Sequence, residues 1–211
     1  HKADEAHQKF VDARSDFLTI LKMWDWIETL KREESKSSFK KTLKKNFLNF
    51  RRTVEWSETR DQLARICKTL GLKANTDKAS YRAIHLPMII GNLSNLARLK
   101  DRTQYQGARN QSLMIFPGSG LFKKKHAWIV STEIIETSRI YARDAASIRP
   151  SWVEQCSKHL QKERFDDPHW SKKRGEVMGY QTVSLYGLVL AEKRRKPLGN
   201  KDPKPVSYTH L

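Results

Sequence analysis

Apolar side chains recur at helical spacing through the first hundred residues of the chain. After Ser15, which is suited to cap a helix, one stripe contains Phe17, Ile20, Leu21, Trp24 and Ile27 and predicts a helix over about residues 16–32. The same spacing predicts three more helices: one with Phe39, Leu43, Phe47 and Phe50, one capped by Thr53 with Leu63, Ile66, Cys67 and Leu70, and one over about residues 78–99 with Tyr81, Ile84, Met88, Leu93 and Leu96. Residues 1–100 are therefore expected to form a helical bundle, with a kink or break at Pro87.

Two side chains of this half that could carry chemistry are expected to be structural instead. Cys67 lies on the third stripe, where a small core residue is a better interpretation than a nucleophile. His85 lies beside the fourth stripe, and we interpret it as a packed or surface histidine rather than a metal ligand.

The spacing changes in the second half of the chain. Residues 101–110 are polar and include Gly107, which indicates a domain boundary or a long hairpin. Beyond them, β-branched and alternating residues predict strands over Leu113–Phe116, Trp128–Thr137, Arg139–Ser147, Val177–Val183 and Leu185–Leu190, with a short helix from about Pro150 to Leu160 among them. Five or so short strands with one intervening helix fit a small, partly open barrel. The predicted fold class is therefore α+β, with an N-terminal helical bundle followed by this barrel.

Charge adds a functional indication to this fold. The 211 residues include 41 Lys and Arg against 23 Asp and Glu, a net charge of +18, and the excess is spread over both halves. Such a balance favours a polyanionic partner, most simply a nucleic acid. The longest uncharged apolar runs, such as Leu86–Leu93, are far shorter than the roughly 20 residues of a membrane span, so no membrane partner is expected. The two cysteines indicate a reducing compartment, and the helix-like start without Met suggests a fragment.

The best local candidate for binding is the turn Gly118-Ser119-Gly120, followed by Lys123, Lys124 and Lys125. Glycines let the backbone approach a phosphate closely, and free amides together with three ammonium groups would hold one. Trp128 and Tyr141, on neighbouring predicted strands, could stack a base or fill the core, and for Trp128 the core is favoured. The lysine triplet is the stronger indication.

Two long stretches of the sequence resemble the accessory domains of DEAH-family RNA helicases. Ser15–Trp24, Asn46–Arg51 and Gln62-Leu63 resemble the end of the helicase-associated helical bundle, or ratchet domain. A second set of stretches resembles the family's OB-fold domain: Ile115–Phe122, Trp128–Val130, Glu133–Ser138 and Ile140–Arg143. Pro168–Gly175 and Leu185–Gly187 resemble one bacterial branch of the family. The barrel is therefore expected to be OB-like.

This resemblance implies a division of the chain into four parts. Residues 1–100 would form the end of the helical bundle, and residues 101–165 the OB-fold core. Residues 166–192 would supply further barrel strands or begin the branch-specific region. Residues 193–211 are basic and contain prolines, and this composition predicts a disordered tail. Lys204–Leu211 does not continue the family pattern, which suggests an incomplete or artefactual reading frame there.

The resemblance also implies a function. Two ATPase lobes, with ATP and Mg²⁺, would lie upstream of this chain, which itself would need no cofactor and hydrolyse nothing alone. The partners would be single-stranded RNA and those lobes, in the cytoplasm. The nucleic-acid contacts would come from Arg109, Gly118, Ser119, Gly120, Lys123, Lys124, Lys125 and Arg139. Thr137, Arg139 and Tyr141 match recurring family positions, with roles open between RNA contact and packing.

Three other motifs are excluded as sites of chemistry, and two alternative functions stay open. Asp4-Glu5-Ala6-His7 spells the family's Mg²⁺ box, but no buried strand precedes it, so we interpret it as a coincidence. The chain has no G-x-x-x-x-G-K-[ST] phosphate loop, and Asp166-Asp167-Pro168-His169 is interpreted as a turn. The alternatives are a stand-alone basic OB-type module that binds nucleic acid, and a protein–protein adaptor.

Overall fold

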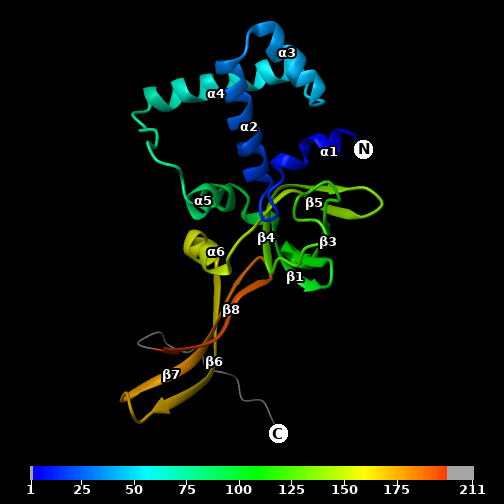
Figure 1. The fold of residues 1–211 in the computed structure, drawn as a ribbon. Coiled ribbons are helices and arrows are strands. Elements are labelled where there is room, and N and C mark those ends of the chain that lie inside the picture. The colour runs from blue at the N-terminus through cyan, green and yellow to red at the C-terminus, as the bar shows by residue number, and fades with distance from the viewer. Residues whose placement is uncertain (1, 199–211) are drawn as a thin grey trace.

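The computed structural model describes residues 2–198, which form three regions along one axis (Figure 1). Helices α1–α4 lie at one end, a β-barrel flanked by α5 and α6 lies in the middle, and a three-stranded sheet extends away from it (Figure 1). The α-helices are α1 (Lys2–His7), α2 (Asp16–Glu33), α3 (Lys36–Lys45), α4 (Phe50–Thr69), α5 (Tyr81–Gly91) and α6 (Pro150–Cys156). Short 3-10 turns are η1 (Gln8–Phe10), η2 (Leu93–Asn95), η3 (Ala108–Asn110) and η4 (Lys158–Leu160).

Helices α2, α3 and α4 begin at side-chain caps, and α2 and α3 pack through part of their predicted stripes, because Ile20, Leu21 and Phe47 are exposed. Ser15 accepts a hydrogen bond from the amide of Leu18 at the start of α2, and Ser35 and Asn49 do the same for α3 and α4. Asn49, not Thr53, caps α4, because the chain already turns through Phe47 at a φ of 56°. Ile27, Phe39 and Leu43 form the core shared by these helices.

The second half of α4 contradicts the predicted core. Leu63, Ile66, Cys67 and Leu70 are all exposed, so the interpretation of Cys67 as a core residue is wrong. In Figure 1 this part of α4 extends past α2 and α3. The apolar stripe is present as predicted, but no element within residues 2–198 packs against it.

The last predicted helix is shorter than expected, and Pro87 does not break it. α5 continues through Pro87 to Gly91, and buried His85 and Ile89 pack it on both sides of the proline. A proline removes one helical hydrogen bond, and this packing compensates for it. Leu93 lies in η2 and Leu96 starts a strand, so the end of the predicted helix belongs to other elements.

Five strands close into a barrel: β1 (Leu96–Asp101), β2 (Gln104–Gly107), β3 (Ser112–Ile115), β4 (Trp128–Glu136) and β5 (Ile140–Ser147). Their order is β1-β2-β3-β5-β4, and pairing of β1 with β4 closes the ring. The α+β class with helices before an OB-like barrel is confirmed, although the barrel is closed rather than partly open. Strands β1 and β2 come from residues expected to end a helix and to form a polar boundary. The predicted division at residue 100 therefore falls inside β1.

The intervening helix, α6, connects the barrel to a second sheet. This antiparallel sheet consists of β6 (Lys162–Ser171), β7 (Glu176–Leu185) and β8 (Leu188–Pro197). The strands predicted over residues 177–190 therefore belong here and not to the barrel, because β7 and β8 pair with each other across the tight turn at Tyr186-Gly187. Asp166–His169, predicted as a turn, is a bulge inside β6.

Residues Lys193–Pro197, predicted to be disordered, complete β8. The rest of the predicted tail, residues 199–211, lies outside the described residues, as does the segment suspected to be artefactual. None of the helices within residues 2–198 has the length and apolar content needed to cross a bilayer.

One core cluster joins α5, the barrel, α6 and the second sheet. It contains Ile89 of α5, Trp128 and Val130 of β4, Val153 of α6 and Leu188 of β8. Trp128 is only 6% exposed, as its predicted core position requires. A second cluster, centred on Tyr105, Leu113 and Ile129, fills the barrel itself.

Candidate nucleic-acid interface

The connection between β3 and β4 carries the lysine triplet outward. We call residues 117–125 the lysine loop. Lys123, Lys124 and Lys125 are exposed, while Leu121, in the same loop, is fully buried in the barrel core. Lys123 turns the chain at a φ of 63°, and the amide of Lys124 donates to the carbonyl of Leu121. The buried leucine therefore fixes a loop whose charged side chains face solvent.

The glycine-rich turn of this loop is held by Asp16, the first residue of α2. The Asp16 carboxylate accepts hydrogen bonds from Ser119 Oγ at 2.6 Å, the Gly120 amide at 2.9 Å and the Ala145 amide of β5 at 2.8 Å. A Cβ atom at Gly120 would lie 2.3 Å from the Asp12 carbonyl oxygen, so the glycine permits this close approach. The expectation of free amides in the turn is wrong for Gly120, whose amide donates to Asp16, and for Ser119, whose amide donates to the Phe116 carbonyl at 3.0 Å. The turn anchors the lysine loop instead.

The other end of the lysine loop is fixed by His126 and Tyr105. The His126 amide donates to the Tyr105 hydroxyl at 3.3 Å. Burial lowers the pKa of His126, and it raises the pKa of Tyr105, so both groups are held neutral near pH 7. No ion pair among the described residues uses the three lysine ammonium groups. Their positive charge is therefore available to an anionic partner.

The two predicted arginines lie on other connections of the barrel. Arg109 is exposed in η3, between β2 and β3, and its amide donates to the Tyr186 carbonyl of the β7–β8 turn at 2.8 Å. Arg139 is exposed in the β4–β5 turn, with Nη1 3.5 Å from the Met114 sulfur. OB folds bind oligonucleotides with the faces of strands 2 and 3 and with the loops β1–β2 and β4–β5. Arg139 occupies one of those loops, and no interaction within residues 2–198 joins either arginine to the lysine loop.

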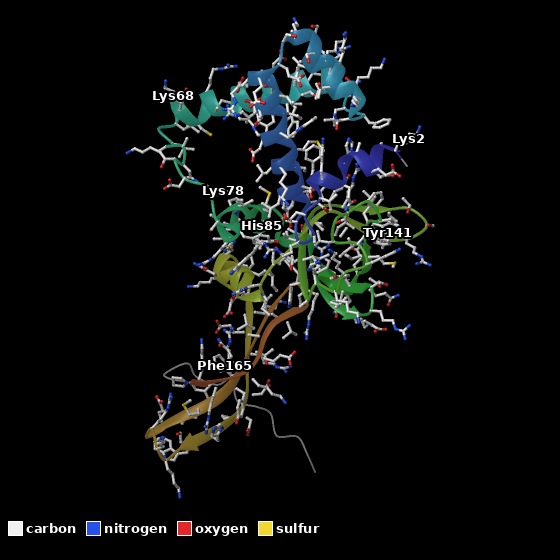
Figure 2. The ribbon with its side chains drawn as sticks, in the orientation of Figure 1. Lys2, Lys68, Lys78, His85, Tyr141 and Phe165 are labelled. Carbon is white, nitrogen blue, oxygen red and sulfur yellow. The ribbon has the colours of Figure 1, made fainter. Side chains whose placement is uncertain are left out.

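Of the two predicted stacking residues, only Tyr141 has an accessible ring. Tyr141 lies in β5 opposite Met114 of β3, at the barrel position labelled in Figure 2, and is half-buried. Its ring meets Phe116 edge-on, with centroids 6.0 Å apart. Trp128 is packed in the core, which leaves Tyr141 as the aromatic candidate near Arg139.

The residues that the sequence analysis did not assign to a site lie in ordinary helical or packed positions. Asp4–His7 lies in the short helix α1. His85 is fully buried, with Nε2 2.6 Å from Ser15 Oγ and Nδ1 2.6 Å from the Tyr81 carbonyl, so its interpretation as a packed residue is confirmed. Within residues 2–198 no three His, Cys, Asp or Glu side chains are grouped to hold a metal ion.

Comparison with known proteins agrees with this geometry. Residues 84–160, which include the whole barrel, match the family model of the oligonucleotide/oligosaccharide-binding (OB) fold. The chain is 38% identical over 202 residues to the ATP-dependent RNA helicase HrpA of Escherichia coli K12 and, equally, to the HrpA homolog of Haemophilus influenzae. The predicted resemblance to DEAH-family helicases is confirmed. These matches cover 95% of this chain but only 16% of each relative.

A search of solved structures gives the E. coli DExH-box NTPase HrpB, with a TM-score of 0.46 and 16% identity over 89% of this chain and 22% of that one.

The residue of this site that sequence reasoning missed is Asp16. Acidic residues are common in the first turn of a helix because their charge interacts favourably with the helix dipole. The position of Asp16 therefore gave no reason to expect its contact with Gly120, 104 positions away. The only signal was its place beside Ser15 within a stretch that resembles the family.

Proposed function

We propose that this chain is the RNA-guiding accessory region of an ATP-dependent RNA helicase of the DEAH type. It binds single-stranded RNA through the barrel surface, while ATP and Mg²⁺ bind to ATPase lobes outside this chain. The observation that carries the proposal is the lysine loop, in which three unpaired lysines project from a rigid mount on a closed five-stranded barrel. The names of the relatives, both RNA helicases, support it.

The proposed mechanism divides the work between charge and scaffold. Lys123, Lys124 and Lys125 neutralise backbone phosphates and release counterions, which supplies affinity without base specificity. Arg139 and Tyr141 add contacts on the neighbouring face of the barrel. Asp16 connects α2 to both the lysine loop and β5 through hydrogen bonds, so the helical region holds the phosphate-binding loop in place. The chain alone hydrolyses no nucleotide and works in the cytoplasm beside the ATPase lobes.

A salt titration tests this proposal. The affinity for a labelled single-stranded RNA oligonucleotide is measured by fluorescence anisotropy over a range of salt concentrations. In the triple variant K123A/K124A/K125A the slope of log K against log salt should fall by up to about 2, since each phosphate contact to a single strand contributes about 0.7. The matched control K41A/K44A/K45A removes the same charge from exposed positions of α3 and should retain most of the slope.

Three results would contradict the proposal. Equal slopes in the wild type and the K123A/K124A/K125A variant would remove the lysine loop from the interface. Binding that survives high salt would favour the adaptor function, because apolar contacts are not screened. ATP hydrolysis by the isolated chain would contradict the assignment of the ATPase to other parts of the protein.

A further inference from the structure

A second basic surface lies where α5 and α6 meet the start of α2, on the flank of the barrel (Figure 1). It surrounds a hollow of about 460 Å³. The side chains around it include three arginines, two aromatic rings and one hydroxyl: Arg14, Arg82, Arg149, Tyr81, Trp152 and Ser80. We call these three arginines and the space between them the arginine hollow.

The three arginines come from distant parts of the sequence. Arg14 precedes the cap of α2, Arg82 lies in the first turn of α5, and Arg149 stands at the N-cap position of α6. All three side chains are exposed. Their convergence is a property of the fold, because only the packing of α5 against α6 and of β5 against α2 brings them to one hollow.

The guanidinium groups are supported without being neutralised. Arg14 Cζ lies 4.8 Å from the centre of the Tyr81 ring, and Arg149 Cζ lies 6.0 Å from the Trp152 ring. Arg82 Nη2 donates to Gln155 Oε1, a neutral amide. No ion pair between described residues involves any of the three. The nearby Asp12 carboxylate, whose charge interacts with that of Arg14, forms its ion pair with Lys22 at 3.0 Å. Three positive charges therefore share one hollow without a carboxylate paired to any of them.

The floor of the hollow is rigid. The Tyr81 hydroxyl shares its proton between the Arg14 carbonyl at 2.9 Å and the Ser147 carbonyl at 2.8 Å. The Tyr81 ring stacks on buried His85 with centroids 3.9 Å apart, and His85 contacts Ser15. Burial raises the pKa of Tyr81 to about 12, so the phenol stays neutral and adds no negative charge.

From this geometry we propose that the arginine hollow is a phosphate-binding site for the backbone of single-stranded RNA, with the half-buried Trp152 ring stacking an adjacent base. Planar guanidinium groups match phosphate oxygens bidentately, and an aromatic ring stacks any base. The hollow therefore forms a second contact for the RNA, separate from the lysine loop. This inference rests on the proposed RNA-binding function.

The test compares charge-matched variants of the full 211-residue chain in the same anisotropy titration. R14A/R82A/R149A should lower the salt slope by up to about 2 and weaken binding at least tenfold at low salt. The control R51A/R60A/R65A removes the same charge from exposed positions of α4 and should shift the affinity less than threefold. R14K/R82K/R149K should keep most of the slope yet lose affinity, because lysine lacks the bidentate fork. Circular dichroism and the thermal midpoint verify that each variant is folded.

The outcomes separate this inference from the proposed function. If the lysine-loop variant loses binding while R14A/R82A/R149A matches its control, the arginine hollow is not an RNA site although the function stands. If neither variant loses binding, both proposals fall. Inorganic phosphate and a nucleoside monophosphate are also titrated, with heat release as the readout. Should either bind the wild type but not R14A/R82A/R149A while RNA binding is unchanged, the hollow holds a free anion and the RNA assignment is overturned.

Discussion

The lysine loop and the second half of α4 are both exposed, but their anchoring differs. The lysine loop presents charges, and beneath them Leu121, Gly120 and His126 are fixed by the core, by Asp16 and by Tyr105. The second half of α4 presents apolar side chains, and Leu70 is 69% exposed. The exposed charges of the lysine loop are held in fixed positions and can bind an anionic partner. The exposed apolar side chains of α4 pack against nothing within residues 2–198 and add little to stability there.

The largest expected effect separates the two ends of the helical region. Leu43 is 0% exposed, so L43A should lower the free energy of unfolding by about 3 kcal/mol through lost burial and the cavity left behind. L70A should change the free energy of unfolding by less than about 0.5 kcal/mol, because the Leu70 side chain gains little burial on folding. Urea denaturation measures both. A large loss for L70A would mean that the second half of α4 is covered, and the comparison would fail.

The next effect concerns the anchor of the lysine loop. D16A removes a carboxylate that accepts three hydrogen bonds and leaves the amides of Gly120 and Ala145 without their partner, so we expect about 2–3 kcal/mol of destabilisation. D25A, at an exposed position of the same helix, is the control and should be nearly neutral. RNA affinity of folded D16A should also fall, since the lysines lose their fixed position. Unchanged unfolding and unchanged affinity would show that the loop needs no anchor.

Sequence periodicity predicted the helices that pack against helices nearby in the chain, and it predicted the longer strands of the barrel. Ile27 of the first predicted stripe and Phe39 and Leu43 of the second form the helical core. Strands β3, β4 and β5 begin and end within about two residues of their predicted bounds. Strands β1 and β2 were missed because four to six residues, half of them polar, carry too little alternation to outweigh a neighbouring helical stripe. The strand state of β1 depends on pairing with β4, about 30 residues away, and β2 pairs with β1 and β3.

In the candidate site, too, the sequence predicted the local features and missed those that depend on contacts between distant segments. The place of the lysine loop follows from local sequence, because glycines and lysines mark an exposed turn whatever surrounds it. Occupation of the Gly120 amide by Asp16 and the gathering of Arg14, Arg82 and Arg149 depend on contacts between segments far apart in the chain. No spacing within a single sequence reports such contacts. The exposure of Cys67 was missed for the same reason, because a stripe shows that a helix is amphipathic without showing that it has a partner.

The smallest expected effect is a pH dependence of stability that comes from His126, which fixes one end of the lysine loop. Burial is the largest cause that lowers the pKa of His126, and the charge of Lys124 adds to it, against a hydrogen bond with the Ala13 backbone. The unfolded chain, with a histidine pKa near 6.5, therefore binds the proton first as the pH falls. Stability should be full above about pH 6.5 and decrease below it until the folded protein also takes up the proton.

Buried His85, whose pKa is lowered mainly by burial, contributes to stability with the same sign, so the two histidines have to be separated by substitution. The urea midpoint is compared at about pH 7.5 and pH 5.5 for the wild type, H126Q and H85Q. Each single variant should lose less stability on acidification than the wild type. If H126Q loses as much stability on acidification as the wild type while H85Q loses less, acid destabilises the protein only through His85 in α5. In that case the end of the lysine loop next to Tyr105 does not depend on a neutral His126.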